Sequence, residues 1–261
     1  MPPIRSSLLP LVLVLVLPLL LPCASAFDVV GWYVGTNTTA FPLASIRWDI
    51  YSTLRLGYVQ VDPRTGNASC PTDAFFTQSL AAARAHNRSI TLGHGESNLE
   101  ACIYNASTNA TLKAFCDRYV ETVGPAVRSC GAGVAGIEVD HEGDHTTLGK
   151  AGIVSAFERT GYSRILDGMQ KSMGGDYTVS ADLGAWGISG AWGHGDTYPV
   201  GLTPWVDKDI FASNKKLFVN TMSYYWPEDC STWSWKKDGW VTNMLWGIAK
   251  DQINIGIGYY Q

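Results

Sequence analysis

The sequence predicts an α/β fold, a (β/α)8 TIM barrel, of which the chain contains about seven β/α units. Apolar, β-branched runs alternate with segments of helical periodicity, an order typical of a parallel sheet covered by helices. No glycine-rich phosphate-binding motif follows the first apolar run, which disfavours an open doubly wound sheet. The length also suits one barrel domain, because about 235 of the 261 residues follow an N-terminal targeting segment.

Residues 1–26 have the pattern of a secretory signal peptide. A short region with Arg5 precedes an apolar stretch over residues 8–21, and Ala24, Ser25 and Ala26 supply the small residues of a cleavage site. The apolar stretch is too short to span a membrane. We therefore expect residues 27–261 to form the mature domain, secreted or held in the lumen of the secretory pathway, with no membrane contact after the signal is removed.

Seven segments have the composition of buried strands. Each is a short run rich in apolar and β-branched residues and is bounded by turn-forming residues or by a helical segment. The runs are Val29–Val34, Thr53–Val61, Ser89–Gly93, Val134–Glu142, Tyr177–Leu183, Leu217–Tyr224 and Ile253–Tyr259.

Helical segments separate these runs. Thr72 or Asp73 is placed to cap a helix that extends to His86. A helix over about residues 109–127 has apolar residues at steps of three and four, which predicts one buried stripe. Further helices are expected near residues 153–173, 206–212 and 240–250. The chain ends at Gln261, just beyond the seventh strand, so the last strand and helix of a closed barrel are expected to be missing; a fragment, an incorrect gene end and a true departure remain open.

Five cysteines follow the expected signal peptide, an odd number for a chain in an oxidising compartment. We expect two disulfides in the N-terminal half, Cys70–Cys102 and Cys116–Cys130, although spacing alone does not fix the connectivity. Cys230 is then expected to pair with a residue in the part of the barrel that is expected to be missing. No CxxC motif or close Cys/His pairing occurs, so the sequence predicts no metal and no other cofactor.

Composition narrows the range of partners. The net charge of −4 and the absence of a basic run argue against a nucleic-acid partner. Ten tryptophans and twelve tyrosines are an excess that suits the apolar faces of sugar rings as well as it suits a buried core. Five N-x-S/T sequons favour an exported glycoprotein; they begin at Asn37, Asn67, Asn87, Asn105 and Asn109.

Three carboxylates occupy alternate positions of the strand that begins at Val134. They are Glu138, Asp140 and Glu142, and alternate residues of a strand lie on the same face. Such a pattern also occurs on the solvated face of an amphipathic strand. Here the strand lies mid-chain between helices, where parallel strands are buried on both faces, so we interpret the acids as a catalytic group in which at least one carboxyl keeps its proton near neutral pH.

In order and spacing, six segments of the chain resemble glycoside hydrolase family 18, the chitinase and endo-β-N-acetylglucosaminidase family of TIM barrels. The segment GIEVDHE resembles the family's DGxDxDxE signature, and NTMSYYW resembles its MxYD strand. The other segments are VVGWYVG, SIRWDIYSTLRLGYVQVD, SITLGHGE and INIGIGYY. The resemblance covers nearly the whole mature chain.

The resemblance implies roles for the acids. Glu142 matches the general acid that protonates the glycosidic oxygen, and Asp140 matches the residue that turns toward the N-acetyl group of the substrate. In this family the acetamido oxygen attacks the anomeric carbon, so configuration is retained without a protein nucleophile. Glu138 stands where the family has an aspartate and is expected to hold Asp140.

The resemblance also implies a substrate pocket. Tyr224 matches the tyrosine that binds the acetamido carbonyl, with Met222 beneath it, and Tyr225 replaces the family's aspartate at the pocket rim. Tyr33 matches a tyrosine of the first strand, and Tyr58 is expected to line the same floor. Loop residue Trp186 is a further candidate for stacking against sugar, whereas His94 is expected in a turn with a structural role.

The resemblance implies two alternative functions. The first is a secreted, monomeric hydrolase that cleaves β-1,4 bonds next to N-acetylglucosamine in chitin, chitooligosaccharides or an N-glycan core. The second is a catalytically weak or inactive chitinase-like protein that binds such glycans. Glu142 favours the enzyme, since family members that only bind usually replace this acid.

Overall fold

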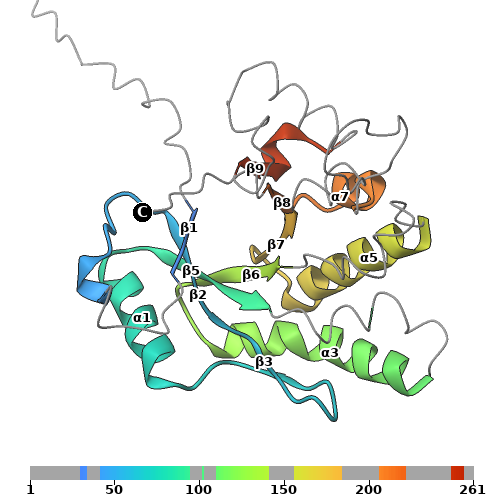
Figure 1. Cartoon of the computed structure of the whole chain (residues 1–261), viewed down its shortest axis with the longest axis horizontal. Coiled ribbons are helices and arrows are strands. Elements are labelled where there is room, and N and C mark those ends of the chain that lie inside the picture. Colours follow the sequence, from blue (N-terminus) through green and yellow to red (C-terminus); the bar gives the residue numbers. More distant parts are fainter. Residues whose placement is uncertain are drawn as a thin grey trace, which may run out of the picture.

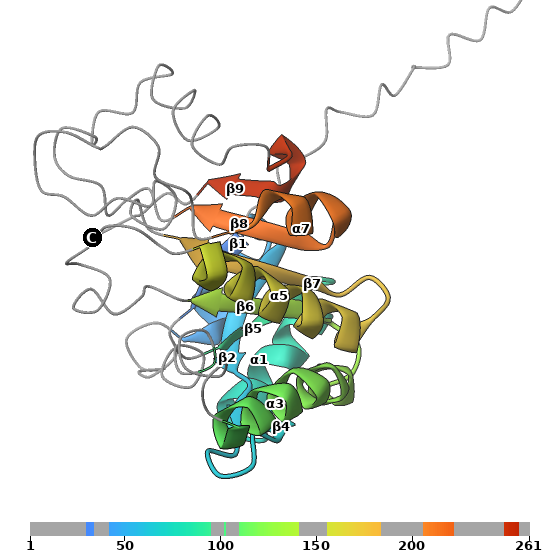
Figure 2. The same cartoon turned by 90° about the vertical axis from the view of Figure 1, so that its right-hand side faces the viewer.

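The computed structural model describes residues 30–33, 42–94, 102, 110–140, 156–183, 206–221 and 248–255. In these ranges, seven strands form one parallel sheet in the order β1-β2-β5-β6-β7-β8-β9. The strands are β1 (Val30–Trp32), β2 (Thr53–Tyr58), β5 (Ser89–His94), β6 (Val134–Asp140), β7 (Thr178–Leu183), β8 (Leu217–Thr221) and β9 (Ile253–Ile255). Neighbouring strands of the sheet follow one another in the order of the chain. The sheet curls as part of a barrel wall, as Figures 1 and 2 show. The expected alternating α/β architecture is confirmed.

Helices cover the outer face of this sheet. They are α1 (Ala74–Ala85), α3 (Ala110–Ser129), α5 (Ala156–Met173) and α7 (Lys208–Ser213). Helix α1 contacts β2 and β5, and α5 contacts β7 and α3 (Figure 2). Asp73 caps α1 as expected, since its carboxylate accepts a hydrogen bond of 2.8 Å from the backbone N–H of Phe76. Among the described residues, no helix is both long and apolar enough to cross a membrane.

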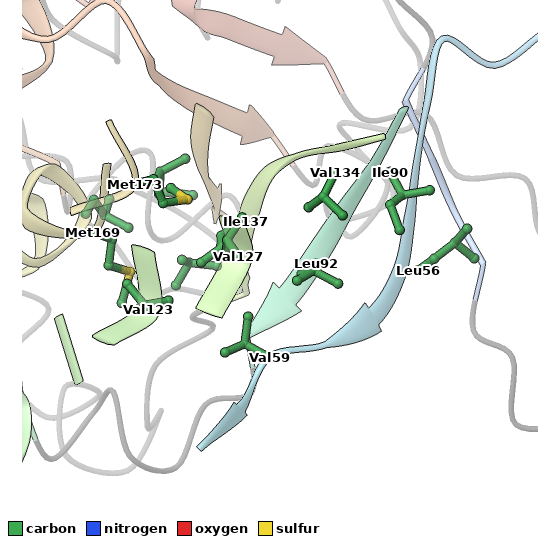
Figure 3. Packing of buried hydrophobic residues seen from close by; sticks show 14 of the residues in the cluster. Leu56, Val59, Ile90, Leu92, Val123, Val127, Val134, Ile137, Met169 and Met173 are labelled. Carbon is green, nitrogen blue, oxygen red and sulfur yellow. The ribbon is translucent and has the colours of Figure 1, made fainter. Parts of the chain in front are cut away.

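The two faces of the sheet differ in chemistry. Outward side chains such as Leu56, Leu92 and Ile137 are fully buried against the helices. Figure 3 shows this packing, with Val123 of α3 and Met169 of α5 in the same cluster. The alternate positions of the same strands face inward and include charged and polar residues, so side-chain alternation separates an apolar layer from a polar interior.

The expected strand over residues 53–61 is wrong in its extent. Strand β2 ends at Tyr58, and the next residues form β3 (Gln60–Val61), which pairs antiparallel with β4 (Ala68–Ser69) outside the main sheet. Gly57 allows this change of direction because its φ of 74° lies in the left-handed region that suits glycine.

The expected disulfide pairing is also wrong. The bonds join Cys70 to Cys130 and Cys102 to Cys116. The β3–β4 hairpin lies along α3, where the N–H of Ala68 donates to the Thr122 hydroxyl at 2.9 Å. That contact brings Cys70 to Cys130, just beyond the end of α3, a proximity that sequence spacing does not reveal.

Of the expected helix over residues 240–250, the structure describes residues 248–250 and shows no α-helix there; a 3-10 turn, η4 (Lys250–Gln252), leads into β9. Residues 240–247 lie outside the described residues, as do the expected signal peptide of residues 1–26 and Cys230.

Candidate active site

Strand β6 places two of the predicted acids inside the curled sheet. Glu138 and Asp140 share one face, whereas Ile137 and Val139 between them are fully buried on the outer face. Glu138 is 1% exposed, and the side chain of Asp140, at the carboxyl end of the strand, is 32% exposed. In barrels of this kind the carboxyl ends of the strands carry the reactive groups.

One arginine of β2 faces both acids. A single nitrogen of Arg55, Nη1, lies 3.3 Å from Glu138 Oε1 and 3.6 Å from Asp140 Oδ2. The same nitrogen lies 3.3 Å from Oδ2 of Asp182 on β7. One guanidinium therefore faces three carboxyl groups at the centre of the sheet's inner face.

A polar row crosses four neighbouring strands at this level. Asp140, Asp182, Asn220 and Asn254 are register partners on β6, β7, β8 and β9. Asn220 Nδ2 donates to Asp182 Oδ1 at 2.8 Å, and Asn254 Nδ2 donates to Asn220 Oδ1 at 2.8 Å. The row therefore fixes the orientation of the Asp182 carboxyl from the side opposite to Arg55.

Sequence reasoning did not name Arg55, Asp182 or Trp32 as site residues. Trp32 of β1 donates its indole N–H to Glu138 Oε1. A signal was present for the two charged residues, since each is a charge at an alternate position of an otherwise apolar strand, in TLRLGY and TVSADL. Only the register between strands shows that these charges meet the acids of β6.

Burial controls the ionisation of this cluster. It raises the pKa of the Asp182 carboxyl well above its usual range, and the adjacent Glu138 carboxyl raises it further. Arg55 and Asn220 act in the opposite direction without outweighing these effects. For Arg55, desolvation would lower the pKa of the guanidinium, but the carboxyls of Glu138, Asp182 and Asp140 outweigh it and raise that pKa.

His94 belongs to the outer layer rather than to this cluster. It is the last residue of β5, not part of a turn as expected, and it is 2% exposed. Its Nδ1 lies 2.7 Å from the hydroxyl of Tyr119 on α3, and the two rings are stacked. Burial lowers the pKa of His94 to about 4, and the charge of Arg55 adds to this shift. His94 is therefore neutral at physiological pH and joins β5 to α3.

The remaining predicted site residues fall into two groups. Tyr58 is half-exposed at the carboxyl end of β2, with its ring 5.3 Å from Arg55 Cζ, whereas Tyr33 stacks on Phe75 of α1 at 5.6 Å. The second group lies outside the described residues and consists of Glu142, Tyr224, Met222, Tyr225 and Trp186. The structure thus brings Glu138, Asp140 and Tyr58 to the same region around Arg55.

Comparison with known proteins gives structural matches only. The sequence matches no protein-family model and no curated protein. The chitinase domain of the spore coat protein CotE from Clostridium difficile is similar with a TM-score of 0.60 at 17% identity, over 92% of this chain and 68% of that one. Catalytic domain 2 of the Group II chitinase from Ostrinia furnacalis, solved with a bound chitooligosaccharide, gives 0.59 at 11% identity, over 89% and 64%. YKL-39, also solved with chitooligosaccharides, gives 0.57 at 10% identity, over 88% and 66%.

These similarities show the fold. The chain has the architecture of a chitinase-like (β/α)8 barrel and contains seven of its parallel strands within the described residues. It spans about two thirds of the length of the solved chains it matches. The resemblance inferred from the sequence is therefore confirmed for the fold.

Proposed function

We propose that this protein is a secreted glycoside hydrolase that cleaves β-1,4 bonds next to N-acetylglucosamine, in chitin, chitooligosaccharides or the core of N-glycans. The observation that carries the proposal is the position of Glu138 and Asp140 on the inner face of a chitinase-like barrel wall, where β6 ends. In the sequence, Glu142 follows Asp140 at the next alternate position. The catalytic domain in this proposal is residues 27–261, after a signal peptide of residues 1–26.

The proposed reaction needs a proton donor and an oriented substrate. Glu142 donates a proton to the glycosidic oxygen as the bond to the anomeric carbon breaks, and the acetamido oxygen of the sugar attacks that carbon from the opposite face. Water then opens the oxazolinium ring with Glu142 as base, which retains the configuration. Asp140 accepts a hydrogen bond from the acetamido N–H and thereby orients the attacking oxygen.

Two features of Asp140 support this role. Its side chain is one-third exposed, so a substrate can reach the carboxyl. The buried oxygen, Oδ1, has no hydrogen-bond partner among the described residues, so rotation of the carboxyl toward substrate breaks no hydrogen bond of that atom. An acceptor in such a position is normally satisfied by a donor, and the acetamido N–H is a donor of the right kind. Tyr58, half-exposed beside Arg55, is proposed to contact a sugar ring with its aromatic face.

The alternative is a chitinase-like protein that binds the same oligosaccharides without cleaving them. One observation favours it: Arg55 Nη1 lies 3.6 Å from Asp140 Oδ2, and an ion pair there opposes the movement of Asp140 toward substrate. Activity and binding must therefore be measured separately.

A fluorogenic N,N'-diacetylchitobioside tests the proposal. We expect hydrolysis by the wild type and a loss of about 100- to 10,000-fold in kcat for Glu142→Gln, because the general acid is removed. Glu121→Gln on the surface of α3 is the matched control, since this side chain is 67% exposed and should not affect the rate. Equal rates for wild type and Glu142→Gln would exclude the mechanism, and calorimetric binding of chitotetraose without any hydrolysis would establish the alternative.

A further inference from the structure

The cluster around Arg55 has a surplus of buried carboxyl groups. Glu138 and Asp182 are each 1% exposed, and both lie 3.3 Å from the same guanidinium nitrogen. Asp140, at 3.6 Å, competes for that nitrogen. No other cation of the described residues forms an ion pair with these three carboxyls. Because two fully buried carboxylates with one shared counter-ion are unfavourable, one of the pair should hold a proton.

The hydrogen bonds indicate which carboxyl holds it. Glu138 Oε1 accepts from the indole of Trp32 and from Arg55, so its surroundings are those of a carboxylate. Asp182 receives a donor on Oδ1 from Asn220, and its Oδ2 lies 3.3 Å from the same Arg55 nitrogen that Glu138 Oε1 approaches to 3.3 Å, so the two carboxyls are neighbours. A hydrogen bond between two carboxyl groups requires a proton on one of them. Because Glu138 Oε1 already accepts from two donors, the proton is assigned to Asp182, and burial, which raises the pKa of Asp182, favours the same assignment.

We propose that Asp182 is a positioning residue, protonated at neutral pH, which donates a hydrogen bond to Glu138 and so fixes Glu138 beside Asp140. This inference rests on the proposed function only where it concerns catalysis. Glu138 is then held by three donors from three strands, namely Trp32, Arg55 and Asp182. Asp140, by contrast, keeps one oxygen without a partner among the described residues and is left to serve the substrate.

The row of amides beyond Asp182 supports this role. Asn254 donates to Asn220, and Asn220 donates to Asp182 Oδ1, so Oδ1 acts as an acceptor and the acidic proton belongs on Oδ2. Oδ2 is also the atom that lies 3.3 Å from Arg55 Nη1, and a protonated oxygen can still accept from a guanidinium. In the described part of the chain, the charged groups that act on the ionisation of Asp182 are Glu138 and Arg55, and Asp140 shares Arg55 with them.

Infrared difference spectroscopy tests the protonation without any assay of activity. At neutral pH, we expect the wild type to show the carbonyl band of a neutral carboxylic acid, and we expect Asp182→Asn to lack it. Glu138→Gln should shift the same band, because the acidic O–H of Asp182 then faces a neutral amide in place of a carboxylate, while burial still favours the protonated acid. Asp167→Asn, which changes a carboxyl on α5 paired with Lys171, should retain the band. A wild type without the band, or Asp182→Asn that keeps it, would refute the proposal.

The conservative variant tests the positioning role. In Asp182→Asn the amide N–H can replace the acidic O–H toward Glu138 while the amide oxygen still accepts from Asn220, so kcat should stay within about threefold of the wild type. Asp182→Leu keeps the branched shape of the side chain but has no donor, and its kcat should fall about 10- to 100-fold, because a hydrogen bond to a charged group is lost. Equal loss in both variants would refute the positioning role. Absence of hydrolysis in the wild type would refute the proposed function, and the infrared spectra would then decide the protonation of Asp182.

Discussion

Acidification should weaken the fold through His94. Burial holds the pKa of this imidazole at about 4, whereas an exposed histidine titrates near 6.5. The unfolded chain therefore binds a proton that the folded chain resists, and stability that is present above pH 6.5 is lost as the pH falls through 4. With each pKa unit worth about 1.4 kcal/mol, the free energy of unfolding should drop by about 3 kcal/mol between pH 7 and pH 4 from this residue alone.

The variant His94→Asn isolates this contribution. Asparagine places a polar atom close to the position of Nδ1, so the contact with the hydroxyl of Tyr119 can persist, but it carries no titratable group. The smaller asparagine side chain leaves a cavity, which lowers the free energy of unfolding by the same amount at every pH. Asp182, whose raised pKa makes stability fall as the pH rises, is present in both proteins and cancels from the difference.

Urea unfolding followed by tryptophan fluorescence measures the effect. The wild type should be the more stable protein at pH 7, and its advantage over His94→Asn should shrink by about 3 kcal/mol at pH 4. A stability difference that is constant over this range would show that the folded protein accommodates a charged His94, and would refute the reasoning. Tyr119 does not interfere, because burial raises the pKa of its hydroxyl further above this range.

Three other changes have calculable outcomes in thermal or urea unfolding. Gly124→Ala should lower the free energy of unfolding by about 1–3 kcal/mol, since its Cβ would overlap the backbone of Ser172 in α5. Gly168→Ala, whose Cβ meets only a side-chain methyl of Val120, should lower it less, and equal losses would contradict this packing. Removing the Cys70–Cys130 disulfide, which closes a loop of 60 residues, should lower the free energy of unfolding by about 4 kcal/mol. Removing Cys102–Cys116, which closes a loop of 14 residues, should lower it by about 3 kcal/mol, and the reverse order would contradict the loop-entropy argument. Arg55→Met should lower the free energy of unfolding by about 3–5 kcal/mol, because it leaves the buried carboxyls without a cation. An unchanged stability would mean that water solvates these carboxyls in the folded protein.

The fold was largely predictable because each strand carries its own signal. Outward residues such as Ile137 and Val139 alternate with Glu138 and Asp140 within a single segment, so local pattern alone separates the two faces of β6. The end of β2 was not predictable in this way. The apolar run continues to Val61. Only the left-handed backbone at Gly57 and the pairing of β3 with β4 show that the chain leaves the main sheet before this run ends.

The site was predictable only where it lies within one strand. The acids of β6 are visible in the sequence, but their partners come from β2 and β7, and register between strands is a long-range property. Arg55 is 83 residues from Glu138, and nothing local links the two. The prediction of the disulfide pairing was wrong for the same reason, since Cys70 reaches Cys130 only because the β3–β4 hairpin packs along α3.

The composition of the inner face argues for function rather than stability. A buried ion cluster is often no more stabilising than apolar residues of the same volume, and sometimes less so by about 1–4 kcal/mol. Three carboxyls around one guanidinium nitrogen, with one raised pKa among them, stabilise a barrel wall less than the mostly apolar packing of its opposite face. Departures from local packing rules of this kind concentrate at functional sites. The cluster lies at the carboxyl ends of β6 and β7, where a barrel enzyme needs its charges, and its cost to stability is the physical reason to look for catalysis there.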